Sequence, residues 1–232
     1  MTDHHVQSGV LEDLTEAVNY RHWLAGLAAP YLGDDPIEIG SGIGDYAAEW
    51  LGGAVPRITV TETHDDRLKL LHERFVDDDR VQVRRLTLPA EETGEHSAAV
   101  ALNVLEHIPD HVGAIRSVTR LLRPGGHVVL IVPAFEFAMS KFDRTIGHER
   151  RYTRALAGEV LAAAGLDVEE LHYINPLGLM SWFLVCRLLG SYPRNGVMLR
   201  TYDRAVIPVV RRLERKWRPP FGQSVFAVGR KP

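Results

Sequence analysis

The segment from Ile37 to Gly44 reads IEIGSGIG, an apolar run that leads into three glycines at alternate positions. Glycine allows backbone angles and close ligand approach that a Cβ would block. A helix that follows such a loop offers free N–H groups at its first turn. The loop could therefore bind a dinucleotide, a phosphate or an uncharged nucleoside, with a tight turn that binds nothing as the alternative. Its GxGxG spacing differs from the GxGxxG of dinucleotide folds, and Glu38 favours a ligand that carries an amine.

A second acid, Glu62, follows Gly40 by 22 residues and ends an alternating segment that begins at Arg57. A carboxylate at the end of the strand after a glycine loop can accept hydrogen bonds from both ribose hydroxyls. Taken alone, Glu62 would be interpreted as an acidic residue on the surface. Together with the loop it predicts a site for a ligand that contains ribose.

The elements that must position these groups alternate along the chain. Apolar periodicity and turn signals predict helices and strands in turn, which indicates a doubly wound α/β sheet. We expect the helix from His111 to stop at Pro124-Gly125-Gly126. Helices are predicted at residues 11–32 (one or two helices), 45–51, 65–75, 111–122 and 153–164, and strands at 36–39, 57–62, 81–86, 98–102, 127–132, 166–174 and 224–229.

The whole chain, residues 1–232, is predicted to be one domain, since 232 residues leave little room for a second. Residues 1–35 would form an N-terminal helical cap and residues 36–133 the ligand-binding core. Residues 134–152 and 175–223 interrupt the alternation. Extra segments on such a scaffold tend to cover the ligand crevice, so we expect them on the substrate side.

Composition excludes several classes of protein. The apolar fraction is 45%, the charged fraction 25% and the net charge −3, which is globular and not globally basic. The single cysteine, Cys186, excludes intrachain disulfides and cysteine-cluster metal sites. The polar start of the chain is not a signal peptide, and no apolar run approaches the ~18–20 residues of a membrane span. These features predict a cytoplasmic protein.

The charge is unevenly distributed, because residues 187–231 carry 11 Lys and Arg but only Asp203 and Glu214 as acids. Such asymmetry is typical of a segment that binds an anionic partner or a membrane surface, or of a solvated basic helix. The same insertion holds a dense apolar patch between Leu177 and Leu189. It could form a lipophilic acceptor channel, a weak membrane contact through residues 187–218, or a helix pair that covers the core.

Two further motifs complete a pattern. Residues 102–110 read LNVLEHIPD and residues 121–126 read LLRPGG. With the glycine loop and Glu62, they resemble the class I S-adenosylmethionine-dependent methyltransferases, in the form seen in ubiquinone-type and natural-product enzymes. The resemblance implies a Rossmann-like seven-stranded sheet whose last strand is antiparallel. It also implies S-adenosylmethionine as cofactor and S-adenosylhomocysteine as product.

Cofactor-binding residues follow from the positions of these motifs. Tyr20 would close over the methionine end of the cofactor, and Asn103 would reach its amino-acid end. The family often has an acid near the adenine, where this chain has Thr87-Leu88, and an Asp at the start of the fourth strand, where it has Ser97 or Ala98. The predicted contacts are Tyr20, Glu38, Gly40, Ser41, Gly42, Gly44, Glu62, Thr63, Thr87, Leu88, Asn103, Val104 and Leu105.

The candidate catalytic bases are His107, just after the fourth strand, and His148, in the first insertion. An imidazole with a pKa of about 6.5 can exchange protons at neutral pH. Arg150 and Arg151 could hold an anionic group of the substrate, with Tyr152 beside them. For each of these residues a structural role is the alternative. The histidines show no metal-ligand spacing, so no metal is predicted.

The leading functional hypothesis is methyl transfer to a small-molecule or lipid-like metabolite. A nicotinamide-dependent oxidoreductase would need GxGxxG and no acid before the loop. A noncatalytic S-adenosylmethionine-binding scaffold would show damage to the loop, which is intact. Nucleic-acid methylation of amino groups would need an Asn/Asp-Pro-Pro-Tyr/Phe motif after the fourth strand, and no basic face with interleaved aromatics stands out. No nucleic-acid partner is predicted.

Overall fold

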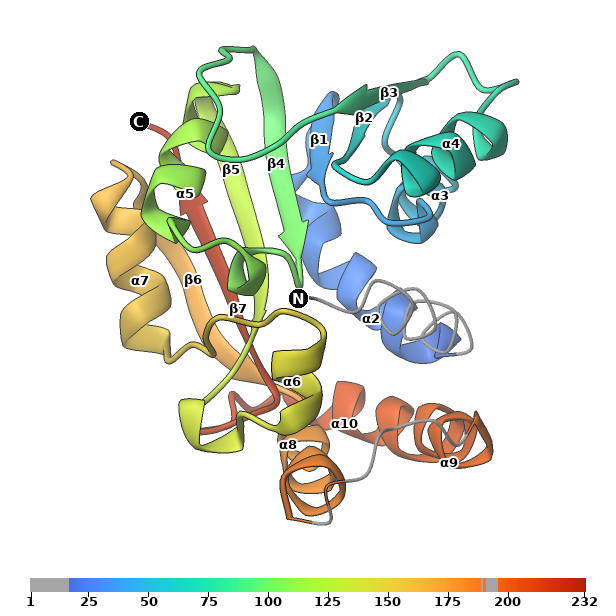
Figure 1. Ribbon diagram of the computed structural model, residues 1–232, viewed down its shortest axis with the longest axis vertical. Coiled ribbons are helices and arrows are strands. Elements are labelled where there is room, and N and C mark those ends of the chain that lie inside the picture. Colours follow the sequence, from blue (N-terminus) through green and yellow to red (C-terminus); the bar gives the residue numbers. More distant parts are fainter. Residues whose placement is uncertain (1–16, 189, 191–195) are drawn as a thin grey trace.

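The computed structural model of the chain describes residues 17–188, 190 and 196–232 (Figure 1). Within these ranges seven strands form one sheet with the order β3-β2-β1-β4-β5-β7-β6. The first five strands run parallel, and β7 runs antiparallel between β5 and β6. The predicted doubly wound fold with an antiparallel last strand is confirmed. The strands are β1 Pro36–Ile39, β2 Ile58–Glu62, β3 Val81–Arg85, β4 His96–Leu102, β5 Leu122–Pro133, β6 Asp167–Ile174 and β7 Ser224–Arg230.

Two apolar cores cover the two faces of the sheet. Consecutive side chains of a strand point to opposite faces, so in β5 Leu130 joins one core and Ile131 the other. Helices α5 and α7 pack on the first face, and α2, α3, α4 and α10 on the second. Both faces of the sheet are buried under helices. This explains why the central strands are apolar throughout and do not alternate between apolar and polar residues. These helices are α2 Val18–Ala28, α3 Asp45–Leu51, α4 Asp65–Arg74, α5 His111–Arg120, α7 Arg154–Ala163 and α10 Ile207–Glu214.

The two insertions contain several further helices and lie side by side beyond the carboxyl end of β4 (Figure 1). The indole N–H of Trp182 donates to the carbonyl of Ala138 at 3.2 Å. The guanidinium of Arg151 also lies 5.0 Å from the centre of the Trp182 ring. The first insertion contains η3 Glu136–Ala138 and α6 Lys141–Thr145, and the second contains α8 Pro176–Trp182, η4 Phe183–Leu188, α9 Gly196–Thr201 and η5 Tyr202–Val206.

Most predicted boundaries agree with the structure to within one or two residues, but β5 does not. It begins at Leu122 and continues through Pro124-Gly125-Gly126, which the sequence predicts as a turn. Lys231 exchanges backbone hydrogen bonds of 2.8 and 2.9 Å with Gly126 and Gly125. The end of the chain therefore supplies partners for a segment whose local sequence favours a turn.

The structure describes only residues 17–32 of the range 11–32, which the sequence predicts as one or two helices. Residues 11–16 lie outside the described part of the chain. Helix α2 begins at Val18, and a 3-10 turn, η1 Ala29–Tyr31, follows it where Pro30 lacks an N–H for the helical pattern. In the described residues, no helix is both long enough and apolar enough to cross a bilayer.

Candidate active site

A cavity of about 480 Å³ opens at the carboxyl ends of β1, β2 and β4. The strand order reverses between β1 and β4, and this is the place where doubly wound sheets bind their ligands. The volume lies within the range of small-molecule sites. Thirteen of the predicted site residues line this cavity: Tyr20, Glu38, Gly40, Ser41, Gly42, Glu62, Thr63, Thr87, Leu88, Asn103, Val104, His107 and His148.

The glycine loop follows β1 directly and forms one wall of the cavity. Gly40 has a φ of +66°, and a Cβ there would lie 2.8 Å from a methyl carbon of Val104. Glycine is thus required at this position both for its backbone angle and for the approach of the neighbouring loop. Gly44 has a packing role instead. A Cβ on it would meet Phe75 and Leu71, so it allows α3 to pack against α4, and it does not line the cavity.

Glu62 ends β2 with its side chain buried at the cavity wall. One carboxylate oxygen accepts from the N–H of Gly42 at 3.1 Å. The other accepts from the N–H of Thr63 at 2.6 Å and that of His64 at 3.3 Å. These bonds hold the carboxylate in one orientation beside the loop. Oε1 also accepts from the hydroxyl of Thr63 at 3.2 Å, so the lone pair left for a hydroxyl of a bound ligand is on Oε2.

Glu38 lies at the base of the same loop and is 3% exposed. One of its oxygens has no hydrogen-bond partner among the described residues. Burial raises the pKa of this carboxyl to about 8. A group kept partly neutral in this way ionises more readily when a cationic ligand enters the cavity.

Tyr20 lines the cavity from the first turn of α2, where no local side chain caps the helix. Instead, Asp203 from the second insertion accepts the N–H of Tyr20 at 2.8 Å and that of Asn19 at 3.0 Å. Asp203 is buried and 183 residues away from Tyr20 in the chain. The insertion thereby fixes the helix that carries Tyr20, a link that sequence reasoning missed because no local signal marks it.

The opposite wall is largely apolar. Leu86 and Leu88 line it, with Ile108 and Pro109 beside them. The absence of an acid at Thr87-Leu88 therefore leaves an apolar surface suited to a flat ring. Leu105, predicted beside these groups, is instead buried in the core and does not line the cavity.

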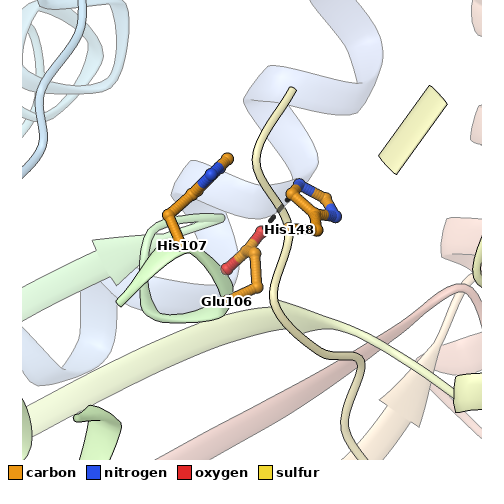
Figure 2. Close-up of side chains that lie close together, drawn as sticks. All are labelled: Glu106, His107 and His148. Atoms are coloured by element: carbon orange, nitrogen blue, oxygen red, sulfur yellow. Dashed lines mark ion pairs between the residues drawn. The ribbon is translucent and has the colours of Figure 1, made fainter. Parts of the chain in front are cut away.

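His107 and His148, which both line the cavity, lie close to Glu106 (Figure 2). His107 belongs to the 3-10 turn η2 Leu105–His107, and its Nδ1 lies 3.2 Å from the carbonyl oxygen of Gly147. The ring centres of His107 and His148 are 4.7 Å apart. His148 Nε2 lies 3.8 Å from Oε1 of Glu106. The fold thus brings together the two histidines that the sequence proposed as separate candidates.

The charged groups behind His148 explain its position. Asp143 Oδ1 lies 2.9 Å from Nδ1 of His148 and 2.8 Å from Nη2 of Arg151. Burial opposes ionisation of Asp143, but its contacts with His148, Arg151 and Ser140 outweigh burial and lower its pKa to about 2. Asp143 also completes a capping box with Ser140 at the start of α6. It is therefore an anion that positions His148.

The two other groups in this cluster have displaced pKa values. Burial, assisted by the neighbouring His148, lowers the pKa of His107 to about 4. Burial raises the pKa of Glu106 to about 7, against the charges of His148 and Arg151. Clustered, displaced pKa values in a cavity are typical of functional sites. The sequence motif contains Glu106, but only the fold shows that its carboxylate faces His148.

The residues predicted to bind the substrate lie outside the cavity lining. Arg150 donates to the backbone carbonyls of Ile108 and Pro109. Arg151 is 5% exposed and binds Asp143 and the carbonyl of Ala134. Tyr152 is fully buried, with its hydroxyl 3.0 Å from Nδ1 of His111. All three hold protein segments together.

Comparisons with known proteins agree with this geometry. A family model described as a methyltransferase domain matches residues 37–128. A ubiquinone biosynthesis O-methyltransferase of Xanthomonas oryzae pv. oryzae is 34% identical over 98 residues, which are 41% of this chain and 36% of that protein. The protein of the same description from Cupriavidus pinatubonensis is 28% identical over 174 residues, covering 67% of this chain and 69% of its own length.

The fold comparison extends over the whole chain. The cyclase SpnF superposes with a TM-score of 0.63 at 19% identity, covering 100% of this chain and 98% of its own. Together with the glycine loop and Glu62, these similarities support the resemblance to class I S-adenosylmethionine-dependent methyltransferases. The match to the Xanthomonas relative spans only about a third of that protein's length (36%), and the cyclase shows that the fold alone does not define the reaction.

Proposed function

We propose that this protein transfers a methyl group from S-adenosylmethionine to a hydroxyl of a small-molecule or lipid-like metabolite. The buried carboxylate of Glu62, beside the glycine loop in the cavity, is the observation that carries the proposal. Relatives described as O-methyltransferases support oxygen as the acceptor atom. An intact loop argues against a noncatalytic scaffold.

The lining residues fit this cofactor. Glu62 would accept one ribose hydroxyl through the lone pair that Gly42 leaves open on Oε2, and a second on Oε1 in place of the hydroxyl of Thr63. The apolar wall around Leu88 suits an adenine ring. Glu38, with an oxygen that has no hydrogen-bond partner, would face the positively charged part of the ligand. When bound, the cofactor supplies a methyl group already activated by its positive sulfur, so the protein mainly orients the reactants and excludes water.

The acceptor end of the cavity is the end that holds His107 and His148. As the acceptor oxygen forms its bond to the methyl carbon, the carbon–sulfur bond breaks with its electron pair retained by sulfur, and the hydroxyl proton must leave. His148, oriented by Asp143, can receive that proton. General base catalysis of this kind contributes about 10²–10⁴ in rate, and positioning contributes the rest of the acceleration.

Calorimetric titration with S-adenosylmethionine and S-adenosylhomocysteine, with NADH as a control ligand, tests the proposal. We expect both sulfur ligands to bind and NADH not to bind. Glu62→Gln should weaken binding of both sulfur ligands at least tenfold, because a carboxamide offers one acceptor oxygen in place of two. Glu159→Gln, an exposed change on α7, is the matched control. If the two variants bind the sulfur ligands with equal affinity, Glu62 does not contribute to the cofactor site.

A second proposal concerns the surface through which the protein reaches its acceptor. Val209, Leu213 and Trp217 are exposed and spaced four residues apart on and just after α10. Arg212 and Arg215 are exposed beside them. An apolar stripe flanked by basic residues is the pattern of helices that rest on anionic membranes. We propose that this surface contacts such a membrane weakly and so gives access to a lipid-like acceptor.

A further inference from the structure

We propose that Glu106, His107 and His148 form a binding site for a divalent transition-metal ion at the acceptor end of the cavity. One potential ligand atom from each residue lies within 4.8 Å of those of the other two. Two imidazoles and one carboxylate form a ligand set suited to zinc, iron, manganese or cobalt. Figure 2 shows the three side chains converging from two separate segments of the chain.

Both histidines are oriented for metal binding through Nε2. The carbonyl oxygen of Gly147 can only accept, so Nδ1 of His107 carries the hydrogen and Nε2 of the neutral ring carries the lone pair. Asp143 lies 2.9 Å from Nδ1 of His148, so in the neutral ring the lone pair would lie on Nε2, 3.8 Å from Glu106. Metal-bound histidines almost always have their other ring nitrogen against a carbonyl or carboxylate.

The environment of Glu106 gives independent support for a cation site. Its side chain is completely buried, and neither carboxylate oxygen has a hydrogen-bond partner among the described residues. A buried carboxylate without hydrogen-bond partners is costly, and the one ion-pair contact of Glu106, with His148, is long at 3.8 Å. The nearby guanidinium of Arg151 binds Asp143 and a backbone carbonyl instead. A bound cation would satisfy Glu106.

The spacing and the position of the cluster indicate a catalytic rather than a structural metal. Ligands bound at about 2.0–2.2 Å from a metal lie about 3–3.5 Å from one another. The ligand atoms here lie within 4.8 Å of one another, so metal binding would require side-chain rotations that bring them closer together. His107 and His148 line the cavity, so the remaining coordination positions face the acceptor. Three protein ligands with open positions are typical of catalytic sites.

A metal at this position would bind the acceptor oxygen, favour release of its proton to solvent and fix the oxygen for methyl transfer. This consequence rests on the proposed methyl transfer, whereas metal binding itself does not. The two histidines would then act as ligands rather than as proton acceptors.

The test is titration of the chelator-treated full-length chain with Co²⁺, followed by visible absorption and by calorimetry. We expect one equivalent to bind and to give the absorption bands of a cobalt–imidazole site. Glu106→Gln, His107→Gln and His148→Gln should each weaken binding at least tenfold. The exposed controls Glu159→Gln and His72→Gln should bind Co²⁺ as the unchanged protein does.

X-ray absorption of the Zn²⁺-loaded, unchanged protein provides a second measurement that does not depend on the folding of any variant. Two imidazole ligands are expected, and a spectrum without them would overturn the proposal. So would Co²⁺ affinity that the three ligand variants leave unaltered. Binding of S-adenosylmethionine without Co²⁺ binding would reject the metal site alone, and Co²⁺ binding without S-adenosylmethionine binding would reject the methyltransferase proposal alone.

Discussion

At the scale of single residues, the site depends on groups whose positions other groups determine. Glu62 is held by backbone N–H groups of the glycine loop and of the turn after β2. His148 is held by Asp143, and Asp143 in turn by Arg151. Removing one partner from a buried ionic cluster typically costs about 3–5 kcal/mol, because the other charge is left unpaired. Asp143 and Arg151 are therefore positioning residues.

Gly40 provides a prediction at this scale. We expect Gly40→Ala to weaken S-adenosylmethionine binding at least tenfold and to destabilise the fold by about 1–3 kcal/mol, because its Cβ would lie 2.8 Å from Val104. Chemical denaturation and calorimetry measure the two effects. Gly165→Ala is the matched control, since Gly165 also has a positive φ (+80°) but no atom within 4 Å of the added carbon. If the clash is the cause, Val104→Ala should partly rescue Gly40→Ala but not Gly165→Ala.

At the scale of elements, the second insertion does more than cover the sheet. Helix α10 packs on α2, and Asp203 binds the N–H groups at the start of α2. A carboxylate at a helix N-terminus satisfies donors that have no partner within the helix and interacts favourably with the helix dipole. The element that carries Tyr20 to the cavity is thereby stabilised by a residue from the far end of the chain.

Asp203→Ala should therefore lower both stability and cofactor affinity. Loss of a capping side chain costs about 0.5–2 kcal/mol, and displacement of Tyr20 should weaken S-adenosylmethionine binding severalfold. Thermal unfolding and calorimetry on the same samples measure these effects. Asp167→Ala, an exposed change at the start of β6, should alter neither. A stable Asp203→Ala variant with unchanged affinity would contradict the link between the insertion and the cavity.

At the scale of the whole molecule, buried acids should make stability depend on pH. Burial raises the pKa of Glu38 to about 8 and that of Glu214 to about 7, from 4.5 in the unfolded chain. A raised acid pKa means that the folded state holds its proton more tightly. The stability gained in this way is complete below pH 4.5 and is lost as the pH rises through 7 and 8.

We expect the Tm to fall by several degrees between pH 6.5 and 9, since about 1 kcal/mol shifts the Tm of a chain this long by about 2–4 °C. The range starts at 6.5 because the buried His107 and His172, both with a pKa lowered to about 4, give the opposite slope below it. Differential scanning calorimetry measures the profile. The variants Glu38→Gln and Glu214→Gln should each make the profile less steep. If both variants show a profile as steep as that of the unchanged protein, other groups are responsible.

The basic, apolar surface around α10 also belongs to this scale. Vesicles that contain anionic lipid should co-sediment a fraction of the protein, and added salt should release it. Arg211→Glu combined with Arg212→Glu should abolish sedimentation and leave S-adenosylmethionine affinity unchanged. Neutral vesicles and the paired change Arg116→Glu with Arg120→Glu on α5 serve as controls. No sedimentation of the unchanged protein would end the membrane proposal.

The amino-acid sequence alone predicted the alternation of helices and strands, the glycine loop, Glu62 and the family. These features depend on local periodicity, on backbone angles that only glycine adopts readily, and on motifs within short segments. The sequence also indicated His107 and His148, as two separate candidates for the catalytic base. The extension of β5 was missed, because its partner is the far end of the chain.

Tertiary structure alone showed what joins these parts. Glu106, His107 and His148 come from positions about forty residues apart, and Asp203 reaches α2 from the opposite end of the chain. The same packing buries Arg151 and Tyr152, which local sequence marks only as polar residues in a loop. Such contacts depend on how elements dock, and docking is set by the shapes of whole faces rather than by the residues next to a site.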